Sequence, residues 1–124
     1  MRRISTGSPF ETTIGYSRAI VKGEWCFVSG VTGYDYTTMT MPEGVADQAT
    51  NCFATIHSVL VDAGFTPDDI VRVTYILTDA ALVAEASPAL AAAMGTVRPA
   101  ATMLIAGLIR PEMKIEIEVT AFRG

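Results

Sequence analysis

The sequence is poor in the residues that build metal centres and acid–base pairs. Its 124 residues include two cysteines and one histidine. Neither Cys26 nor Cys52 has another metal ligand at the spacing of two to four residues that zinc sites use. His57 follows Cys52 by five residues, about 500° around a helix, so the two side chains point in different directions. We therefore expect no metal site and no Cys–His pair, with both thiols buried and His57 solvated or half-buried at the border of an apolar stripe.

Long apolar runs and an excess of basic residues are also missing. No stretch of about 18 apolar residues exists, so no membrane partner is expected. The basic start Met1–Ser5 is not followed by the apolar run of a secretion signal. Nine Lys and Arg stand against thirteen Asp and Glu, which gives a net charge of −4, whereas a nucleic-acid binder needs a basic surface. We expect a cytoplasmic protein with reduced thiols and no nucleic-acid partner.

The residues that are abundant predict a folded domain. Half of them are apolar and only 18% are charged, which excludes intrinsic disorder. One hydrophobic core serves a chain of this length. Because the sequence contains no linker, internal repeat or low-complexity segment, we expect a single domain over residues 1–124.

Hydrophobic periodicity indicates five strands and two helices. A spacing of three and four residues is typical of an amphipathic helix, and Gly64 stands where such a helix ends in a left-handed residue. Pro88 falls inside the second helical segment and should break the helix or delay its start. The expected elements are a hairpin over 17–30, a helix over 45–63, a strand over 70–77, a helix over 79–94, and strands over 101–108 and 113–122.

This order, β-β-α-β-α-β-β, predicts an α+β domain with a mixed sheet and both helices on one face. The last strand alternates strictly, and Lys114, Glu116, Glu118 and Thr120 point away from the core. Alternation alone makes Glu116 an ordinary outward residue, paired with Lys114 or Lys22. The uncovered sheet face carries Thr and Glu but also Ala and Met, so we expect it to be an interface between subunits.

Several short segments, taken in order, point to one protein family. Each segment is weak on its own, but together they span nearly the whole chain. They are Gly15-Tyr16-Ser17, Val28-Ser29-Gly30, Gln48, Ala63-Gly64, Asp68-Asp69-Ile70-Val71, Asp79, Pro99-Ala100 and Ile115-Glu116-Ile117-Glu118. The sequence resembles the Rid family of reactive intermediate/imine deaminases, also called the YjgF family, whose fold is chorismate-mutase-like.

The resemblance implies a homotrimer with three clefts between subunits and no metal or organic cofactor. In the deaminase branch these clefts hydrolyse imines and enamines, such as 2-aminoacrylate, to 2-oxo acids and ammonia, a metabolite-repair reaction. A glutamate there holds the attacking water, and Glu116 matches it. Tyr16, Ser29 and Gly30 match the wall of the cleft. The arginine that binds the substrate carboxylate follows the Pro-Ala pair, and this position is Ala101 here.

The missing guanidinium is the main departure from the family pattern. An arginine binds a carboxylate through two charge-assisted hydrogen bonds, and losing such an anchor costs about 2–5 kcal/mol. Thr102 and Met103 follow Ala101 and are expected to line the same cleft. Arg98, three residues upstream, and Arg18, near the start of the hairpin, are the two candidates for replacing the lost cation.

Three functions are compatible with these features. The first is binding of a small imine- or enamine-type metabolite, with hydrolytic deamination at Glu116 left open because Ala101 replaces the arginine. The second is a non-catalytic, ligand-sensing or partner-binding trimer. The third, RNA cleavage or translation inhibition, follows an older family label and is disfavoured by the net charge. Tyr34 and Tyr36, in a loop over 31–43, either cover the cleft or are ordinary loop residues.

Overall fold

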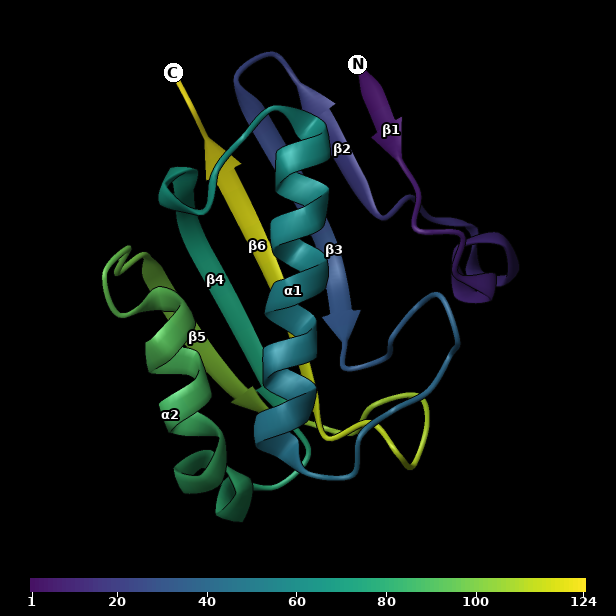
Figure 1. Ribbon diagram of the computed structural model, residues 1–124, viewed down its shortest axis with the longest axis vertical. Coiled ribbons are helices and arrows are strands. Elements are labelled where there is room, and N and C mark those ends of the chain that lie inside the picture. The colour runs from purple at the N-terminus through teal and green to yellow at the C-terminus, as the bar shows by residue number, and fades with distance from the viewer.

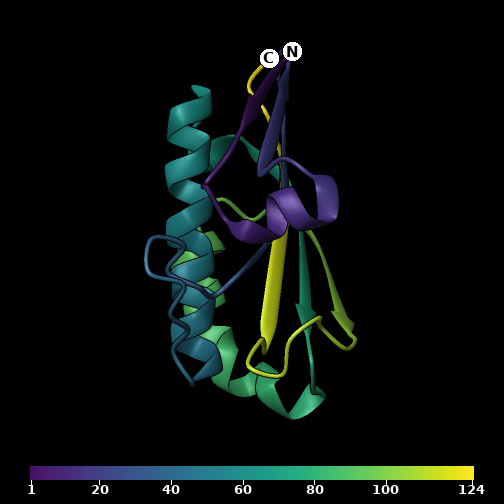
Figure 2. The same cartoon turned by 90° about the vertical axis from the view of Figure 1, so that its right-hand side faces the viewer.

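The computed structural model describes residues 1–124 as two layers, a six-stranded sheet and two helices (Figure 1). The helices, α1 (Val45–Ala63) and α2 (Val83–Met94), lie on the same face of the sheet, which Figure 2 shows edge-on. Only β4 and β5 run parallel, and the other neighbouring strands are antiparallel. In spatial order the strands are β1 (Arg2–Ile4), β2 (Ala19–Lys22), β3 (Trp25–Thr32), β6 (Ile115–Phe122), β4 (Ile70–Leu77) and β5 (Ala100–Ile105).

The expected α+β fold, with a mixed sheet and both helices on one face, is confirmed. One strand was missed, because β1 has three residues and is too short for alternation to reveal. A five-residue π-helical turn, η1 (Glu11–Gly15), follows it and was not expected either. The last two strands are shorter than predicted, since β5 ends at Ile105 and β6 begins at Ile115.

The helix α1 covers the centre of the sheet, because its apolar side chains recur at helical spacing. It begins and ends where the pattern predicts, and Gly64 follows it with a left-handed φ of 84°. Its apolar buried residues are Val45, Ala49, Cys52, Ile56, Val59, Leu60 and Ala63. They pack against β3 and β6 and form most of the helical side of the core.

The helix α2 starts late, as predicted, but Pro88 does not break it. A 3-10 turn over Ala80–Leu82 precedes it, and the Asp79 carboxylate accepts a hydrogen bond from the Ala81 N–H at 2.8 Å. Pro88 lies within the second turn of the helix that begins at Val83. Its ring removes one intrahelical hydrogen bond there, a loss that the packing of Ala86, Leu90 and Met94 offsets.

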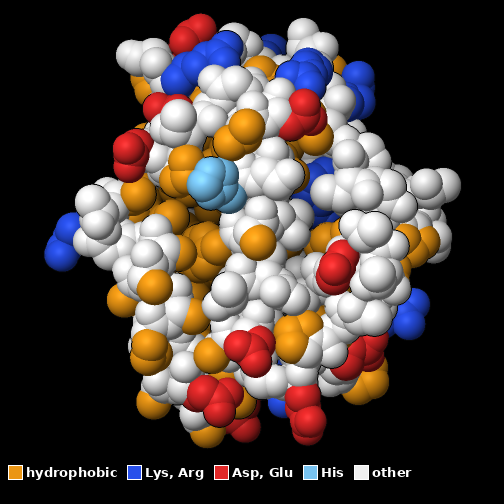
Figure 3. Space-filling model, in the orientation of Figure 1, with side chains coloured by type: hydrophobic (Ala, Val, Ile, Leu, Met, Phe, Trp, Pro, Cys, Tyr) orange, Lys and Arg blue, Asp and Glu red, His pale blue; other side chains and the backbone are white.

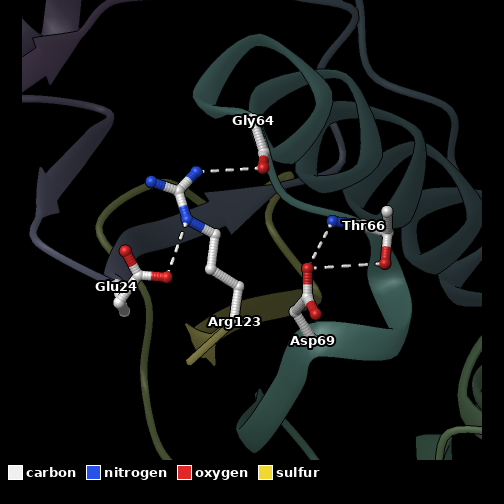
Figure 4. Close-up of polar contacts among 5 residues, drawn as sticks. All are labelled: Glu24, Gly64, Thr66, Asp69 and Arg123. Atoms are coloured by element: carbon white, nitrogen blue, oxygen red, sulfur yellow. Dashed lines mark hydrogen bonds and ion pairs between the residues drawn. The ribbon is translucent and has the colours of Figure 1, made fainter.

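At the hairpin end of β3, the end of the chain is tied to the end of α1 (Figure 4). Arg123 donates to the Gly64 carbonyl oxygen at 3.0 Å, and its Nε lies 3.4 Å from a carboxylate oxygen of Glu24. Asp69 accepts a hydrogen bond from the Thr66 N–H at 2.8 Å and caps the turn that leads into β4. These contacts fix one end of β3, and the candidate site lies at the other.

The helical face has a mixed surface. Figure 3 shows that Asp and Glu side chains gather at the end where α1 begins, and that Lys and Arg side chains form no continuous patch on this face. His57 is exposed on α1, and both cysteines are buried, as expected. No helix has the length and apolarity that crossing a membrane requires.

The opposite face of the sheet is uncovered and more aromatic than the sequence analysis suggests. Trp25 and Phe27 alternate with the buried Cys26 and Val28, so they point away from the helices. The ring of Trp25 lies 4.4 Å from that of Phe122, measured between centroids. All six residues of β5 at the sheet edge are exposed as well. A continuous exposed apolar surface is typical of an interaction site, and the role of this face as a subunit interface stays a prediction.

Candidate functional site

The candidate site is built around an irregularity in β3. Val28 pairs with Val119 on β6 and Val31 pairs with Ile117. Two residues of β3, Ser29 and Gly30, therefore stand opposite one residue of β6, which is the definition of a β-bulge. The Ser29 hydroxyl donates to the Ser17 carbonyl oxygen at 2.7 Å, which fastens the bulge to the segment before β2.

Gly30 leaves room for the carboxylate of Glu116. A Cβ atom at position 30 would lie 2.5 Å from Glu116 Oε1 and 2.7 Å from its Cδ. Any larger residue at this position would displace the Glu116 side chain. The carboxylate consequently lies directly against the backbone of the bulge.

Glu116 lines a cavity of about 280 Å³ that opens between η1, the bulge and the loop before β6. Most of the lining is apolar or aromatic, and Glu116 is its single ionisable carboxylate. The lining residues are Phe10, Ile14, Tyr16, Ser29, Gly30, Thr32, Tyr36, Ile109, Met113 and Glu116. A mainly apolar cavity with a few convergent polar groups is typical of a small-molecule site.

Burial determines the electrostatics of Glu116. Loss of water raises the pKa of this carboxyl group above its ordinary value; the positive charge of Arg18 acts in the opposite direction, and Glu118 adds to the increase. No ion pair forms with Lys22 or Lys114, so the structure does not place Glu116 as an ordinary paired surface residue. A carboxylate with a raised pKa is a stronger base than an ordinary surface carboxylate, and it can hold a water molecule and accept its proton.

Arg18 lies behind the wall of the cavity and is 1% exposed. Its guanidinium donates to the carbonyl oxygens of Gly30 at 2.7 Å and Ser29 at 3.3 Å, and to the Tyr16 hydroxyl at 3.3 Å. The guanidinium already donates to these three groups, and Arg18 does not line the cavity. The structure therefore does not support direct binding of a substrate carboxylate by Arg18.

A buried glutamine positions the loop on the other side of the cavity. Gln48 Nε2 donates to the carbonyl oxygens of Pro42 at 2.9 Å and Glu112 at 3.0 Å. Its Oε1 accepts a hydrogen bond from the Lys114 N–H at 2.9 Å. Met113, between two of these partners, is thereby held at the cavity.

Four of the residues expected to form the site lie together. Tyr16, Ser29, Gly30 and Glu116 all line the cavity, although three of them are distant from Glu116 in sequence. The other four expected residues do not line it within the same chain. They are Arg98 and the β5 residues Ala101, Thr102 and Met103.

Arg98 and Ala101 instead share a second cavity, of about 350 Å³, beside α2. Its lining also includes Tyr75 from β4 and Met94 from α2. Arg98 has a left-handed φ of 50°, uncommon for a residue other than glycine, and its N–H donates to the Met94 carbonyl oxygen at 2.8 Å. Arg98 and Ala101 are exposed residues at the edge of the isolated chain.

Most of the apolar lining could not be predicted from the sequence. Tyr36 lines the cavity, and its hydroxyl accepts a hydrogen bond from the Thr32 N–H at 3.2 Å. Tyr34 is buried and donates to the Glu112 carboxylate. Ile14 lies in the unexpected turn η1, and Phe10 directly precedes that turn. The aromatic character of the 31–43 loop was the one available signal.

Comparison with known proteins decides the family. The family model described as Endoribonuclease L-PSP matches residues 6–123. The chain belongs to the Rid (YjgF) family. This membership, which the residue pattern predicted, supports small-molecule binding or deamination in general.

Solved structures of family members have the same fold. A YjgF-family protein from Mycobacterium tuberculosis is 33% identical, with 98% of each chain covered and a TM-score of 0.89. The YjgF gene product of Escherichia coli is 26% identical over the full length of both chains, with a TM-score of 0.87. A RutC family protein from Pyrococcus horikoshii is 28% identical over 109 residues, which cover 87% of this chain and 86% of that protein.

Proposed function

We propose that the protein binds a small imine- or enamine-type metabolite in the Glu116 cavity and hydrolyses it. The observation that carries this proposal is the Glu116 carboxylate itself, which lies unpaired against Gly30 in a mainly apolar cavity. A partly buried carboxylate without an ion pair loses part of its hydration and gains no counter-charge in return. Holding a water molecule and taking its proton gives that carboxylate a chemical role.

Hydrolysis at this site requires Glu116 to carry two protons, one after the other, from oxygen to nitrogen. Glu116 accepts a proton from the bound water as the water oxygen forms a bond to the carbon of C=N, and the C=N electron pair moves to nitrogen. The carboxyl group then gives this proton to nitrogen. Glu116 next accepts the proton of the new hydroxyl group and passes it to the amino group, so that the carbonyl forms, the C–N bond breaks and ammonia leaves. A raised pKa of Glu116 suits these steps, because the same group must accept and release each proton.

A homotrimer completes the site in this proposal. The uncovered sheet face carries Trp25, Phe27 and Phe122, exposed to 42%, 47% and 37%. We assign this face to the contacts between subunits, with the exposed β5 residues of each subunit placed toward the cavity of its neighbour. Thr102 and Met103 then contribute polar and apolar contacts to the ligand, and Ala101 contributes space.

The substrate in this proposal lacks a carboxylate. No cation lines the Glu116 cavity, and Ala101 replaces the arginine that anchors a carboxylate in the deaminase branch. The negative charge of Glu116 also repels an anion. A neutral C=N compound of similar size therefore fits better than the imine of a free amino acid.

The same substitution favours one alternative, a trimer that binds a ligand without turning it over. Loss of the anchoring arginine is a change expected in a family member that has left deaminase chemistry. RNA cleavage finds less support, because the net charge is −4 and no histidine lines the cavity.

The deciding experiment measures ammonia and carbonyl release from two substrates, 2-aminoacrylate generated in situ and a neutral acyclic imine with an unsubstituted nitrogen. We expect turnover of the neutral imine by the wild-type protein and a loss of at least about 100-fold in Glu116→Gln, the size typical of a general base. Glu118→Gln is the matched control, with the same change on the same face of β6, and should remain active. Ala101→Arg should gain activity toward 2-aminoacrylate.

Two results would count against catalysis. Equal activity of the wild-type protein and Glu116→Gln would remove Glu116 from the mechanism. Inactivity of all four proteins toward both substrates, together with binding of the neutral imine seen by calorimetry, would establish the ligand-binding alternative.

A further inference from the structure

The most unusual buried group in the molecule is the guanidinium of Arg18. It is the largest side chain in the nearly inaccessible part of the core, and no acidic side chain forms an ion pair with it. Its Nε has no hydrogen-bond acceptor within the chain. Removing a charge from water without a counter-charge is costly. A packing role would be filled at lower cost by an apolar residue, so the charge itself needs an explanation.

Every contact of this guanidinium leads to the wall of the Glu116 cavity. Its two terminal nitrogens bind the Ser29 and Gly30 carbonyl oxygens and the Tyr16 hydroxyl. Its central carbon lies 5.5 Å from the centroid of the Tyr16 ring and 5.2 Å from that of Tyr36. A cation within about 6 Å of an aromatic ring is attracted to the face of that ring. One side chain thus joins the bulge to both tyrosines that line the cavity.

The charge of Arg18 also acts on the acidic groups around it. Burial acts to raise the pKa values of Glu11 in η1 and Glu116 in β6, and the positive charge of Arg18 acts to lower both. Cys52 on α1 is a buried thiol that both Glu116 and Arg18 influence, and Glu118 adds a second negative charge near Glu116. Among these neighbours Arg18 is the single cation that favours the charged form of Glu116. Glu11 is already satisfied by Thr6, whose N–H and hydroxyl donate to it.

We propose that Arg18 is a positioning residue of the site, which fastens the Ser29–Gly30 bulge to Tyr16 and Tyr36 and places a fixed positive charge behind the Glu116 carboxylate. It acts through Glu116 and the wall, and it touches no substrate. The role in catalysis rests on the proposed function, whereas the effect on Glu116 does not.

The hydrogen bonds of Arg18 give the bulge a second property. Donation to the carbonyl oxygens of Ser29 and Gly30 withdraws electron density from these two peptide groups, because hydrogen bonds in a chain polarise one another. The N–H groups that follow these carbonyls become stronger donors. The cation therefore stabilises the bulge in the conformation that Glu116 requires and favours a negative charge nearby.

The test compares Arg18→Gln with Arg18→Lys, which keeps the charge and loses the planar fork. Arg3→Gln is the matched control, because it removes one exposed arginine from β1. The readout is the pKa of Glu116, followed by ¹³C NMR of the side-chain carboxyls and assigned by the loss of its signal in Glu116→Gln. We expect a higher pKa of Glu116 in Arg18→Gln, little change in Arg18→Lys, and none in Arg3→Gln.

A purely structural role would leave the titration of Glu116 unchanged in a folded Arg18→Gln protein, and that result would overturn the proposal. Where Arg18→Gln does not fold, Arg18 is replaced by citrulline, which keeps the shape and removes the charge. Ligation of a synthetic segment 1–25 to a chain that begins at Cys26 gives this protein. An unchanged Glu116 titration in the citrulline protein would refute the proposal equally.

Activity gives a separate readout. A higher pKa of Glu116 moves the acid limb of the rate profile to higher pH, so Arg18→Gln should lose more activity at pH 5 than at pH 8 relative to the wild-type protein. If the wild-type protein turns over no imine, the proposed function fails, while the NMR titration still decides the role of Arg18.

Discussion

At the scale of single residues, the site depends on the absence of a side chain at Gly30. Gly30 has no Cβ, and the carboxylate of Glu116 occupies the space that a Cβ would need. The atoms in conflict are the far end of a flexible side chain, so an alanine could be accommodated if Glu116 moved away. An alanine at position 30 should therefore affect the stability of the fold and the binding of ligand to different extents.

Gly30→Ala should reduce stability by only about 1 kcal/mol, a typical effect of a point mutation, and reduce activity or ligand affinity by more than 10-fold because the carboxylate is displaced. Thermal unfolding and ligand titration measure the two effects. Gly107→Ala is the control, since a Cβ there meets no atom within 4 Å. A Gly30→Ala protein with wild-type affinity would show that the position of Glu116 against the bulge is unimportant.

The partly buried carboxyl group of Glu116 should also give stability a dependence on pH. Burial raises the pKa of Glu116 in the folded chain, so the folded state holds this proton to higher pH than the unfolded state does. The free energy of unfolding then falls as pH rises from the ordinary carboxyl range through the raised pKa. Glu116→Gln has no carboxyl group that titrates at this position, so its free energy of unfolding lacks this decrease. We expect Glu116→Gln to be more stable than the wild-type protein at pH 8, with a smaller difference at pH 4. Urea denaturation at both pH values measures the difference in stability. A wild-type protein that is more stable than Glu116→Gln at pH 8 would contradict the prediction.

At the scale of elements, one amide connects three segments of the chain. Gln48 lies in the first turn of α1 and binds the loop before the helix and the turn before β6. Because each partner is a backbone group, removing the amide leaves those groups without their acceptor or donor. The position of Met113 at the cavity depends on these bonds.

Gln48→Leu should reduce the free energy of unfolding by about 3 kcal/mol, at about 1 kcal/mol for each of three lost hydrogen bonds. Asn51→Leu is the control on the same helix, since Asn51 makes one such bond, to the Gly33 carbonyl oxygen at 3.0 Å, and should cost about one third as much. Urea denaturation of both variants gives the comparison. Equal losses would mean that Gln48 acts through packing alone.

Long elements with a clear period could be predicted from the sequence, and short ones could not. The helix α1 and the strand β4 repeat their apolar pattern over many residues, whereas β1 and η1 are shorter than the window that reveals a period. The bulge is likewise invisible, because one extra residue leaves both flanking patterns intact. Tyr16, Ser29, Gly30 and Glu116 were identified by their order in a family pattern. Phe10 and Ile14 were missed, and the role of Tyr36 was left open, because tertiary contacts alone bring these residues to the cavity.

At the scale of the whole molecule, the two faces of the sheet differ. The helices cover one face, and the other leaves aromatic side chains in solvent, which a monomer rarely does over a continuous area. The expected residues Ala101, Thr102 and Met103 lie on the uncovered edge strand, away from the cavity that Glu116 lines. A site between two subunits would place β5 of one subunit beside the Glu116 cavity of its neighbour, so that all of these residues could contact the same ligand.

Assembly and activity should therefore fail together. In sedimentation the wild-type protein should have three times the chain mass of 13.2 kDa. Phe27→Asp places a charge on the uncovered sheet face and should yield monomers that no longer bind or turn over the ligand. Val61→Asp is the control, because Val61 is 60% exposed on α1, outside that face, and should remain trimeric and active. A monomeric Phe27→Asp protein with full activity would show that each subunit carries a complete site, and it would remove β5 of the neighbour from the mechanism.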